Sequence, residues 1–241
     1  MLWGDAMAFF VVEGNIGAGK STFLRLMGQQ LNAELAFEPH EAWQNIEGEN
    51  LLDAFYKDGK RWAYTFQTYA FITRVISVEQ HARLTQHPYL LVERSVFADR
   101  YCFAQNAHEI GLMNDLEWAL YKDWFSWFVE NRVDKPHGFI YLRTDPRICF
   151  ERLTKRNRFE EKLVELDYLT LIHNRHESWL VHKKEIAPVI RDVPVLILDC
   201  DEDFENNSVL QKELSDRVAE FVSKQTGLSI AETRSENQMR L

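Results

Sequence analysis

The chain has 241 residues, with 28 Lys or Arg against 37 Asp or Glu, so its formal net charge is −9. This acidic balance argues against a protein whose main partner is the phosphate backbone of a nucleic acid, because such a surface needs positive potential. No stretch approaches the ~20 uncharged apolar residues of a membrane-spanning helix. The first ten residues contain Asp5 and no Arg, so they resemble neither a signal peptide nor a transit peptide. Cys102, Cys149 and Cys200 are too far apart for a disulfide framework or a CxxC metal site, and we therefore expect a reducing, cytoplasmic compartment.

Short and nearly continuous apolar segments recur at wide intervals along the chain: residues 8–12, 33–37, 89–92, 138–142 and 193–198. Continuous hydrophobicity over this length is typical of parallel strands that are buried on both faces. Helical patterns lie between and after them, at residues 21–30, 59–84, 95–108, 114–131, from 144 onward and 208–226. This alternation predicts an α/β fold with about five parallel strands and helices on both faces of the sheet. We expect one domain over residues 1–241, with a core at about 8–224 and a frayed polar tail at 229–241.

The segment 114–131 carries a stripe of large apolar residues: Leu116, Leu120, Trp124, Trp127 and Phe128. Apolar residues at helical spacing most simply belong to the core. If part of the stripe is exposed, it would suit a dimer interface instead.

A Gly-rich motif follows the first predicted strand and opens a helix. It matches GxxxxGK[ST] and comprises Gly14, Asn15, Ile16, Gly17, Ala18, Gly19, Lys20, Ser21 and Thr22. The glycines let backbone N–H groups turn toward phosphate oxygens, and the helix N-terminus adds partial positive charge. In such a loop the Lys reaches the β- and γ-phosphates and the Ser hydroxyl holds Mg²⁺. The sequence therefore predicts a site for a nucleoside triphosphate with Mg²⁺.

Two carboxylates come at the ends of predicted strands. Glu38 follows the second strand, and Glu93 ends the third, directly before Arg94. In a parallel sheet the carboxyl ends of the strands line the ligand crevice. One carboxylate can bind Mg²⁺ while the other accepts a proton from an attacking hydroxyl, and Arg94 would steady the transferring phosphoryl group.

An aromatic-rich helix begins near Trp62. On it, Gln67, Ala70 and Arg74 share one face, since they follow the spacing i, i+3, i+7. An amide and a guanidinium could read the edge of a base while Phe66 stacks on its plane. An aromatic stripe is more often core, but the core interpretation does not explain the polar Gln67 and Arg74 on that face.

Several longer runs resemble the deoxyribonucleoside kinases of the deoxycytidine/deoxyguanosine kinase type. These runs are EGNIGAGKST (13–22), FEP followed by Trp43 (37–43), RWAYTFQTYA (61–70), ERSVFADRY (93–101), EEKLVELDYL (160–169), HESWL (176–180) and VPVLILDCDEDF (193–204). They stand in the family's order over residues 8–222. The resemblance implies a P-loop kinase fold with an arginine-bearing lid and a homodimer. It also implies nucleotide salvage, in which ATP or another triphosphate gives its γ-phosphoryl group to the 5′-hydroxyl of a deoxynucleoside, with Mg²⁺.

The same resemblance implies a role for each matching residue. Glu38 would be the base near the 5′-hydroxyl, with Arg94 on that hydroxyl and Glu93 beside Mg²⁺, although either carboxylate remains a candidate proton acceptor. The deoxynucleoside would be held by Tyr56 and Glu161 at the 3′-hydroxyl, by Gln67 at the base edge, and by Trp43, Phe66 and Phe103 around the ring. The donor would be held by Arg152, Arg156 and Arg158 of the lid and by a loop with Glu202, Asp203 and Phe204.

Arg74 and Asp99 bear on the choice of nucleoside. In thymidine-preferring relatives the arginine position is typically apolar, so the charged pair resembles the branch that accepts deoxycytidine, deoxyadenosine and deoxyguanosine. Two departures affect the base pocket. Ala42 stands where relatives usually carry a long basic residue, and His40-Glu41 replaces a small apolar pair.

Three alternatives remain open at this point. The first is a thymidine-preferring or broad-specificity deoxynucleoside kinase. The second is a thymidylate-kinase-like enzyme, whose acceptor is already a phosphate and needs no base such as Glu38. The third is a non-catalytic structural relative, which would be free to lose Lys20, Glu38 or Arg94, whereas this chain retains all three.

Overall fold

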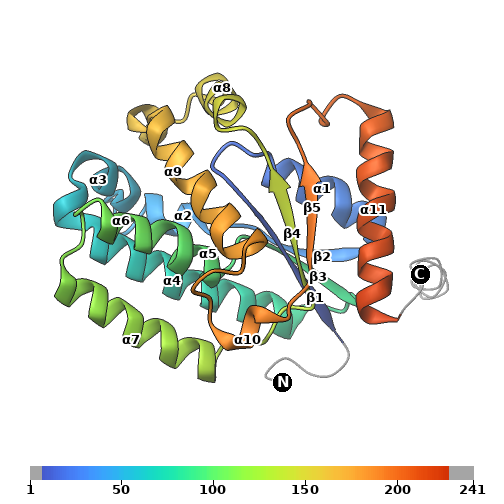
Figure 1. The fold of residues 1–241 in the computed structure, drawn as a ribbon, viewed down its shortest axis with the longest axis horizontal. Helices are drawn as coiled ribbons and strands as arrows, with labels where there is room; N and C mark the ends of the chain where they lie inside the picture. The colour runs from blue at the N-terminus through green and yellow to red at the C-terminus, as the bar shows by residue number, and fades with distance from the viewer. Residues whose placement is uncertain (1–6, 228–241) are drawn as a thin grey trace.

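The computed structural model describes residues 7–227, so the predicted tail at 229–241 lies outside the described residues. Five parallel strands form one sheet in the order β2-β3-β1-β4-β5 (Figure 1). Their bounds are β1 (Ala8–Gly14), β2 (Ala33–Ala36), β3 (Tyr89–Glu93), β4 (Gly138–Arg143) and β5 (Val195–Asp199). The prediction of about five parallel strands is confirmed.

Burial on both faces explains why the strands are apolar almost throughout. Along β1, Phe9 and Val11 point into one hydrophobic cluster, while Phe10 and Val12 point into a second cluster on the other face. This alternation is the side-chain period of a strand. The central strand is therefore sealed from water on both sides, and only its carboxyl end opens toward a ligand.

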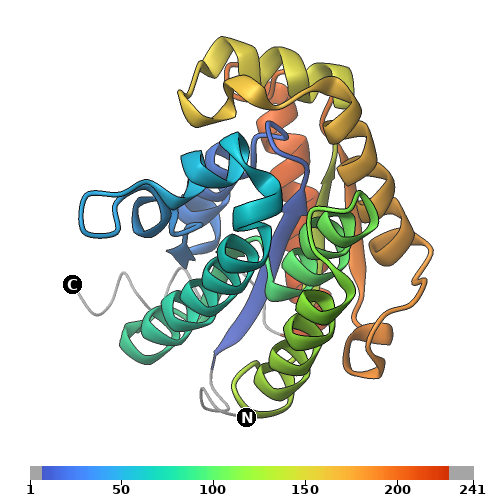
Figure 2. The ribbon, with the colours of Figure 1, turned by 90° about the vertical axis from the view of Figure 1, so that its left-hand side faces the viewer.

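Helices cover both faces of the sheet. Those longer than a single turn are α1 (Lys20–Leu31), α2 (His40–Gln44), α3 (Leu51–Lys57), α4 (Gly59–Leu84), α6 (Gln105–Glu109), α7 (Asp115–Asn131), α8 (Pro146–Arg156), α9 (Leu166–His176) and α11 (Ser208–Thr226). Helices α1 and α11 cover one face, whereas the long α4 and α7 lie side by side over the other (Figures 1 and 2). Within residues 7–227, no helix has both the length and the apolar character needed to cross a membrane.

The predicted helix at residues 95–108 is present but irregular. It consists of the short α5 (Val96–Ala98), the π-helical η1 (Asp99–Ala104) and then α6. The Ser95 side chain caps α5 by accepting hydrogen bonds from the N–H groups of Phe97 and Ala98. Such π-helical turns are frequent at functional sites. Here η1 carries Asp99 and Phe103, both of which line the cavity described below.

The structure corrects the core prediction for α7. The helix buries Tyr121 and Phe125, and Phe128 packs against the same core. The other members of the predicted stripe are 43% to 70% exposed: Leu116, Leu120, Trp124 and Trp127. Helix α7 is apolar on more than one face, and only one of these faces can pack against the core. The core assignment of these four residues is wrong.

Three short elements remain among the described residues. They are the 3₁₀ turn η2 (Glu160–Leu163), the π-helical η3 (Glu177–Val181) and α10 (Pro188–Arg191). Helix α8 begins as predicted, with the Asp145 side chain accepting from the Arg147 N–H and Pro146 in the first turn. Helix α8 and η2 lie above the carboxyl ends of the strands (Figure 1).

Candidate active site

The loop between β1 and α1 depends on glycine at two positions. Gly17 and Gly19 have φ values of 82° and 90°, in the left-handed region that favours glycine. A Cβ atom at Gly17 would overlap the carbonyl oxygen of Cys149, and one at Gly19 would lie 2.8 Å from the Phe204 ring. The loop therefore packs tightly against α8 and the loop before α11, and the N-terminus of α1 faces the site.

Lys20 and Ser21 open α1 at the edge of the site. Lys20 is 6% exposed, and its Nζ donates to the carbonyl oxygen of Asn15 at 2.9 Å. Burial and the charge of Arg94 lower the pKa of Lys20 to about 8, against the opposing pull of nearby carboxylates. The Ser21 hydroxyl donates to Oε1 of Glu93 at 2.8 Å.

Ser21 and Glu93 have the donor atoms that Mg²⁺ prefers. A hydroxyl and a carboxylate oxygen are hard ligands, and Mg²⁺ bound with phosphates needs only one or two carboxylates. Among the described residues no group of three or more His, Cys, Asp or Glu side chains could hold a metal ion. The pair beside the Gly-rich loop thus fits a magnesium ion that shares its coordination with phosphates.

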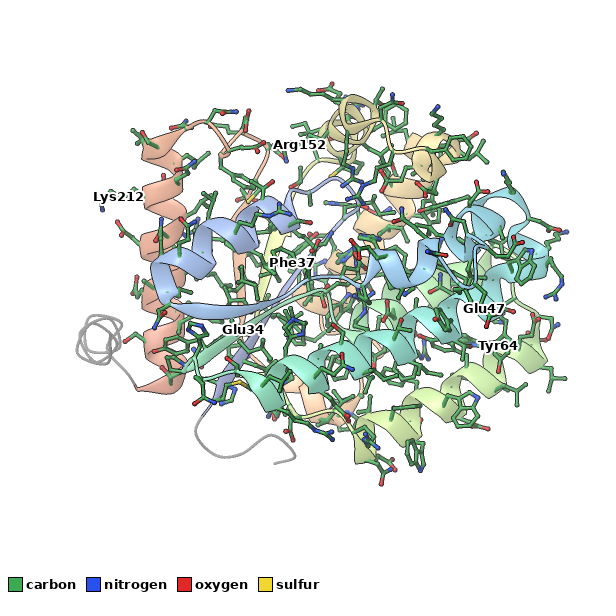
Figure 3. All side chains as sticks on the ribbon, turned by 180° about the vertical axis from the view of Figure 1, so that it is seen from behind. Glu34, Phe37, Glu47, Tyr64, Arg152 and Lys212 are labelled. Carbon is green, nitrogen blue, oxygen red and sulfur yellow. The ribbon has the colours of Figure 1, made fainter. Side chains whose placement is uncertain are left out.

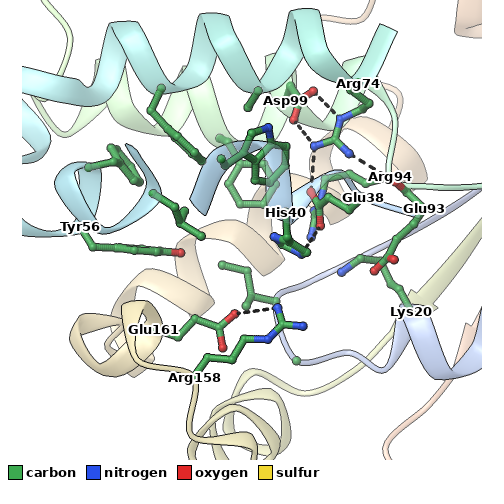
Figure 4. A pocket seen from close by; sticks show the side chains of 18 of the residues that line it. Lys20, Glu38, His40, Tyr56, Arg74, Glu93, Arg94, Asp99, Arg158 and Glu161 are labelled. Atoms are coloured by element: carbon green, nitrogen blue, oxygen red, sulfur yellow. Dashed lines mark hydrogen bonds and ion pairs between the residues drawn. The ribbon is translucent and has the colours of Figure 1, made fainter. Parts of the chain in front are cut away.

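A cavity of about 690 Å³, open to solvent, lies at the carboxyl ends of β2 and β3 beside the loop (Figure 4). The structure brings together in its wall every residue that the sequence predicts for the acceptor: Glu38, Trp43, Tyr56, Phe66, Gln67, Arg74, Glu93, Arg94, Asp99, Phe103 and Glu161. Lys20, Ser21, Arg156 and Arg158 line the same cavity. These side chains come from segments spread over most of the chain.

Glu38 is held by two arginines on one oxygen. Its Oε1 accepts from Nη2 of Arg74 at 2.8 Å and from Nε of Arg94 at 3.1 Å, while Oε2 lies 3.3 Å from Nε2 of His40. Burial alone would raise the pKa of Glu38, but the charges of Arg94 and Arg74 outweigh it and hold this pKa well below its usual range. The carboxylate is therefore ionised at neutral pH and available as a proton acceptor.

Arg74 joins Glu38 to Asp99. Its Nε donates to Oδ2 of Asp99 at 2.7 Å, and its Nη2 donates to Oδ1 at 3.0 Å. Both residues are almost fully buried, and burial raises the pKa of Asp99 against the opposing charge of Arg74. This bidentate pair places a fixed charge pattern in the wall of the cavity.

Arg94 has features of a residue waiting for a ligand. Its φ of 62° is rare for a non-glycine residue, and such strain clusters at functional sites. The Nη1 atom is buried and has no hydrogen-bond partner among the described residues. The guanidinium lies 4.5 Å from the ring centroid of Phe103. A phosphate or hydroxyl oxygen in the cavity would satisfy the orphaned donor.

Aromatic rings form a slot opposite the arginines. Trp43 meets Phe66 edge-on at 5.6 Å, and Phe66 stacks on Phe55 at 4.8 Å. The Trp43 Nε1 donates to Oγ1 of Thr73 at 2.9 Å, which fixes the indole. The buried amide of Gln67 has no hydrogen-bond partner within residues 7–227. A flat apolar ring with a polar edge is the ligand that this slot suits.

The segment after α8 covers the cavity from above. Nη2 of Arg156 donates to both carboxylate oxygens of Glu161, at 2.5 and 2.6 Å, and Nη1 of Arg158 lies 3.7 Å from Oε1. Burial raises the pKa of Tyr56 well above its usual range, and Tyr168 and Glu161 raise it further. Tyr56 and Glu161 lie on the same side of the cavity (Figure 4).

A second cavity, of about 1,460 Å³, lies on the other side of the Gly-rich loop. The predicted donor residues that line it are Gly17, Gly19, Thr22, Arg152, Arg156, Asp203 and Phe204. Gly17 and Arg156 line both cavities, so the two meet at the loop.

Arg152 lies at the edge of the molecule beside the loop that precedes α11 (Figure 3). Its guanidinium donates at 3.0 Å to the carbonyl oxygens of Cys200, Asp201 and Glu202. Arg152 therefore fastens this loop to α8 as well as lining the donor cavity.

Some predicted residues line neither cavity. They are Gly14, Asn15, Ala18 and Glu202. The Asn15 amide donates to the carbonyl oxygen of Leu169, and Gly14 packs against Leu142. Ile16, predicted on the donor side, lines the acceptor cavity. The first three shape the loop, and Glu202 contributes its backbone carbonyl.

The sequence prediction missed three polar residues. His40 and Tyr168 line the acceptor cavity, and Glu13 is fully buried behind it. Oε1 of Glu13 accepts from the N–H and the hydroxyl of Ser95, and burial raises the pKa of Glu13 to about 7 against the opposing charge of Arg94. A carboxylate inside an apolar strand was the available signal for Glu13, and the departure at positions 40–41 was the signal for His40.

Known proteins are similar to this chain over most of its length. A family model described as deoxynucleoside kinase matches residues 10–223. Deoxycytidine kinase 2 of Gallus gallus is 41% identical, with 88% of this chain and 89% of that protein covered. The mitochondrial deoxyguanosine kinase of Xenopus laevis is 40% identical, with 88% of each covered. The deoxycytidine kinase of Homo sapiens is 37% identical, with 88% of this chain and 90% of that protein covered.

Proposed function

Because this chain belongs to the deoxynucleoside kinase family, we propose that it transfers the γ-phosphoryl group of ATP, or of another nucleoside triphosphate, to the 5′-hydroxyl of a deoxynucleoside in nucleotide salvage. The observation that carries this proposal is the meeting of two cavities at the Gly-rich loop. One has the loop and Arg152 for a triphosphate. The other has an aromatic slot and an ionised carboxylate for a ring and a hydroxyl.

The transfer would proceed with Glu38 as the base. The bond between the 5′-oxygen and the γ-phosphorus forms while the bond to the bridging oxygen of the donor breaks, and the 5′ proton passes to the Glu38 carboxylate. Glu38 is ionised before the substrate arrives, which is the state that a proton acceptor needs. Glu93 is the other candidate, but its hydrogen bond to Ser21 supports a place on the phosphate side.

Cationic side chains would stabilise the transferring group. Lys20, Arg94, Arg156 and Arg158 all line the acceptor cavity, so they can face the negative charge that moves from donor to acceptor. Arg156 would have to exchange its contact with Glu161 for a phosphate, which would release the carboxylate for the 3′-hydroxyl beside Tyr56. Closing the lid would keep water out, which otherwise competes as an acceptor.

We assign the magnesium site to Ser21 and Glu93. When bound there with the triphosphate, the ion would neutralise charge on the β- and γ-phosphate oxygens. Glu93→Gln should weaken this site, and the concentration of Mg²⁺ needed for half-maximal turnover should rise.

For the nucleoside, we propose deoxycytidine, deoxyadenosine and deoxyguanosine over thymidine. The Arg74–Asp99 pair supports this choice, since a carboxylate can accept from the exocyclic amino group of cytosine or adenine, which thymine lacks. The test incubates the full chain with Mg-ATP and each of the four deoxynucleosides and follows the monophosphate. Thymidine turned over as efficiently as the best purine would contradict the ranking and favour a broad or thymidine-preferring enzyme.

We also propose that the chain is a single catalytic domain over residues 1–241, with its core at about 8–224, and that it acts as a homodimer in the cytoplasm. The exposed aromatic face of α7 supports the dimer. The three cysteines are free and buried, which fits a reducing compartment. One of the relatives carries a mitochondrial location in its name, so fractionation of the source cells is the test of location.

A further inference from the structure

Glu160 lies next to Glu161, but its side chain has no part in the proposed mechanism. It opens the 3₁₀ turn η2, which follows α8. Glu161 is buried, lines the acceptor cavity and pairs with Arg156 and Arg158 (Figure 4). Glu160 is half-buried and does not line that cavity. The two neighbouring carboxylates therefore contact different parts of the molecule.

Two side-chain amides hold the Glu160 carboxylate. Its Oε1 accepts from Nε2 of Gln44 and from Nδ2 of Asn50, both at 2.9 Å. Partial burial raises the pKa of Glu160, but hydrogen bonds from its own N–H, from Asn50 and from Gln44 outweigh this effect and lower the pKa below its usual value. The carboxylate is therefore ionised at neutral pH, and hydrogen bonds to a charged acceptor are stronger than those between neutral groups.

Both amides belong to elements that carry the wall of the acceptor cavity. Gln44 ends α2, the helix of Trp43. Asn50 caps α3, because its Oδ1 accepts from the N–H of Asp53, and α3 carries Tyr56. Trp43 and Tyr56 both line the acceptor cavity. One carboxylate oxygen thus ties η2 to both short helices that carry residues proposed to hold the nucleoside.

A second contact joins η2 to α3 and is weaker. Nζ of Lys57, at the end of α3, lies 5.8 Å from the ring centroid of Phe159, the residue before η2. Phe159 is 63% exposed, and a cation over an exposed ring is attracted only weakly. The hydrogen bonds of Glu160 are therefore the main polar tie between η2 and these two helices.

The position of η2 matters because Arg156 and Glu161 have to exchange partners. In the structure Nη2 of Arg156 donates to both carboxylate oxygens of Glu161. In the proposed reaction the 3′-hydroxyl takes Glu161, and the phosphates take Arg156. A turn that is free to move would carry Glu161 along with Arg156 and keep the pair intact. The exchange therefore requires that η2 stays fixed to the wall of the acceptor cavity.

We propose that Glu160 couples the two substrate sites by holding η2 on the wall of the acceptor cavity. A bound deoxynucleoside then draws Glu161 away from Arg156 and frees Arg156 for the triphosphate. Glu160 acts through these two side chains and is a positioning residue. The inference rests on the proposed function, since it concerns the two substrates of that same transfer. Coupling between binding sites is reciprocal, so each substrate should raise the affinity for the other by the same factor.

The experiment measures by calorimetry the Kd of a non-hydrolysable ATP analogue with Mg²⁺, without and with a saturating concentration of the best deoxynucleoside substrate. In the wild-type chain the nucleoside should lower this Kd by a factor of about five or more, and in Glu160→Ala by less than about two. The Kd without nucleoside should be similar in both, because the Gly-rich loop is unchanged. The control is Glu165→Ala, an exposed carboxylate of the same segment that caps no N–H group, and it should keep the wild-type factor.

An exchange of the two side-chain groups tests the contact itself. Asn50→Asp can still cap α3, but it places a second carboxylate against Glu160, so the effect of the nucleoside on the Kd should be lost. The double variant Asn50→Asp/Glu160→Gln brings an amide and a carboxylate together again with their positions exchanged. It should recover the wild-type factor, which a general loss of stability would not explain. Thermal unfolding checks that each variant is folded at the temperature of the measurement.

The outcomes separate the inference from the function. A wild-type chain that phosphorylates no deoxynucleoside would contradict both. An active wild-type chain in which the nucleoside leaves the Kd of the analogue unchanged overturns only the role of Glu160. So does a Glu160→Ala variant that keeps the wild-type factor, or a folded double variant that does not recover it.

Discussion

The buried carboxylate of Glu13 makes stability depend on pH. Burial raises its pKa from 4.5 to about 7, so between these pH values the folded chain holds a proton that the unfolded chain has lost. The free energy of unfolding should therefore fall as the pH rises from about 4.5 to 7, and the loss persists above pH 7. The variant Glu13→Gln has no group at this position that can ionise, so its free energy of unfolding should not show this fall. In the wild-type chain the fall should amount to up to about 3 kcal/mol between pH 5 and pH 8. Urea unfolding at both pH values measures it, and an unchanged slope would contradict the assignment.

Removing only one partner of the Arg74–Asp99 pair should destabilise the folded chain. Arg74→Met leaves Asp99 buried without its counter-charge, and we expect a loss of about 3–5 kcal/mol in the free energy of unfolding. The double variant Arg74→Met/Asp99→Leu should recover part of it, because no unpaired charge remains. Arg143→Met, which breaks the exposed pair with Asp199, should cost less than about 1 kcal/mol. Equal losses for the two arginines would show that burial of the charge does not matter.

At the scale of elements, the Gly-rich loop is fixed by its contact with α8. In the variant Gly17→Ala, an alanine would have to adopt the left-handed backbone conformation, which costs about 1–2 kcal/mol. Its Cβ atom would also have to displace the carbonyl oxygen of Cys149. We expect weaker ATP binding by calorimetry and a larger loss of stability than in the control. The control is Gly111→Ala, whose φ is also positive, at 76°, but whose added Cβ meets nothing within 4 Å. Equal behaviour of the two variants would exclude the steric explanation.

The regular elements were predictable because their signals are local. The apolar strands, the Gly-rich loop and the cap of α7 at Asn114 each follow from a few neighbouring residues. The π-helical η1 was not predictable, since its residues have an ordinary helical pattern. The contact between Oε2 of Glu38 and His40 was equally hidden, because it depends on the path of the chain through Pro39.

For the whole molecule, the family match and the five-stranded parallel sheet confirm the predicted fold and a kinase of deoxynucleosides. Most of the acceptor residues lie in the longer motif runs and could be predicted from them, whereas Tyr56, Arg74 and Phe103 lie outside those runs. The roles of all of them remain proposals. The faces of α7 could not be assigned, because an isolated helix pattern does not say which of two apolar faces meets the core.

The exposed face of α7 bears on assembly. We expect the wild-type chain to sediment at twice its own mass, and Trp124→Glu/Trp127→Glu to sediment as a monomer, since both rings are about half exposed on one helix. Val209→Glu changes an apolar residue that is 78% exposed on α11, and it should leave the dimer intact. Analytical ultracentrifugation measures the mass in solution of the wild-type chain and of both variants. A double variant that remains dimeric would place the interface elsewhere.

The most direct test of the central claim is the kcat of Glu38→Gln in phosphoryl transfer from Mg-ATP to the best of the four deoxynucleosides. The substitution keeps the shape of the side chain but removes the proton acceptor, so kcat should fall by about 10²–10⁴ while ATP binding is kept. Glu34→Gln changes a half-buried carboxylate on β2 outside the cavity, and it should leave kcat unchanged. A Glu38→Gln variant that turns over within a few-fold of the wild-type chain would contradict the account.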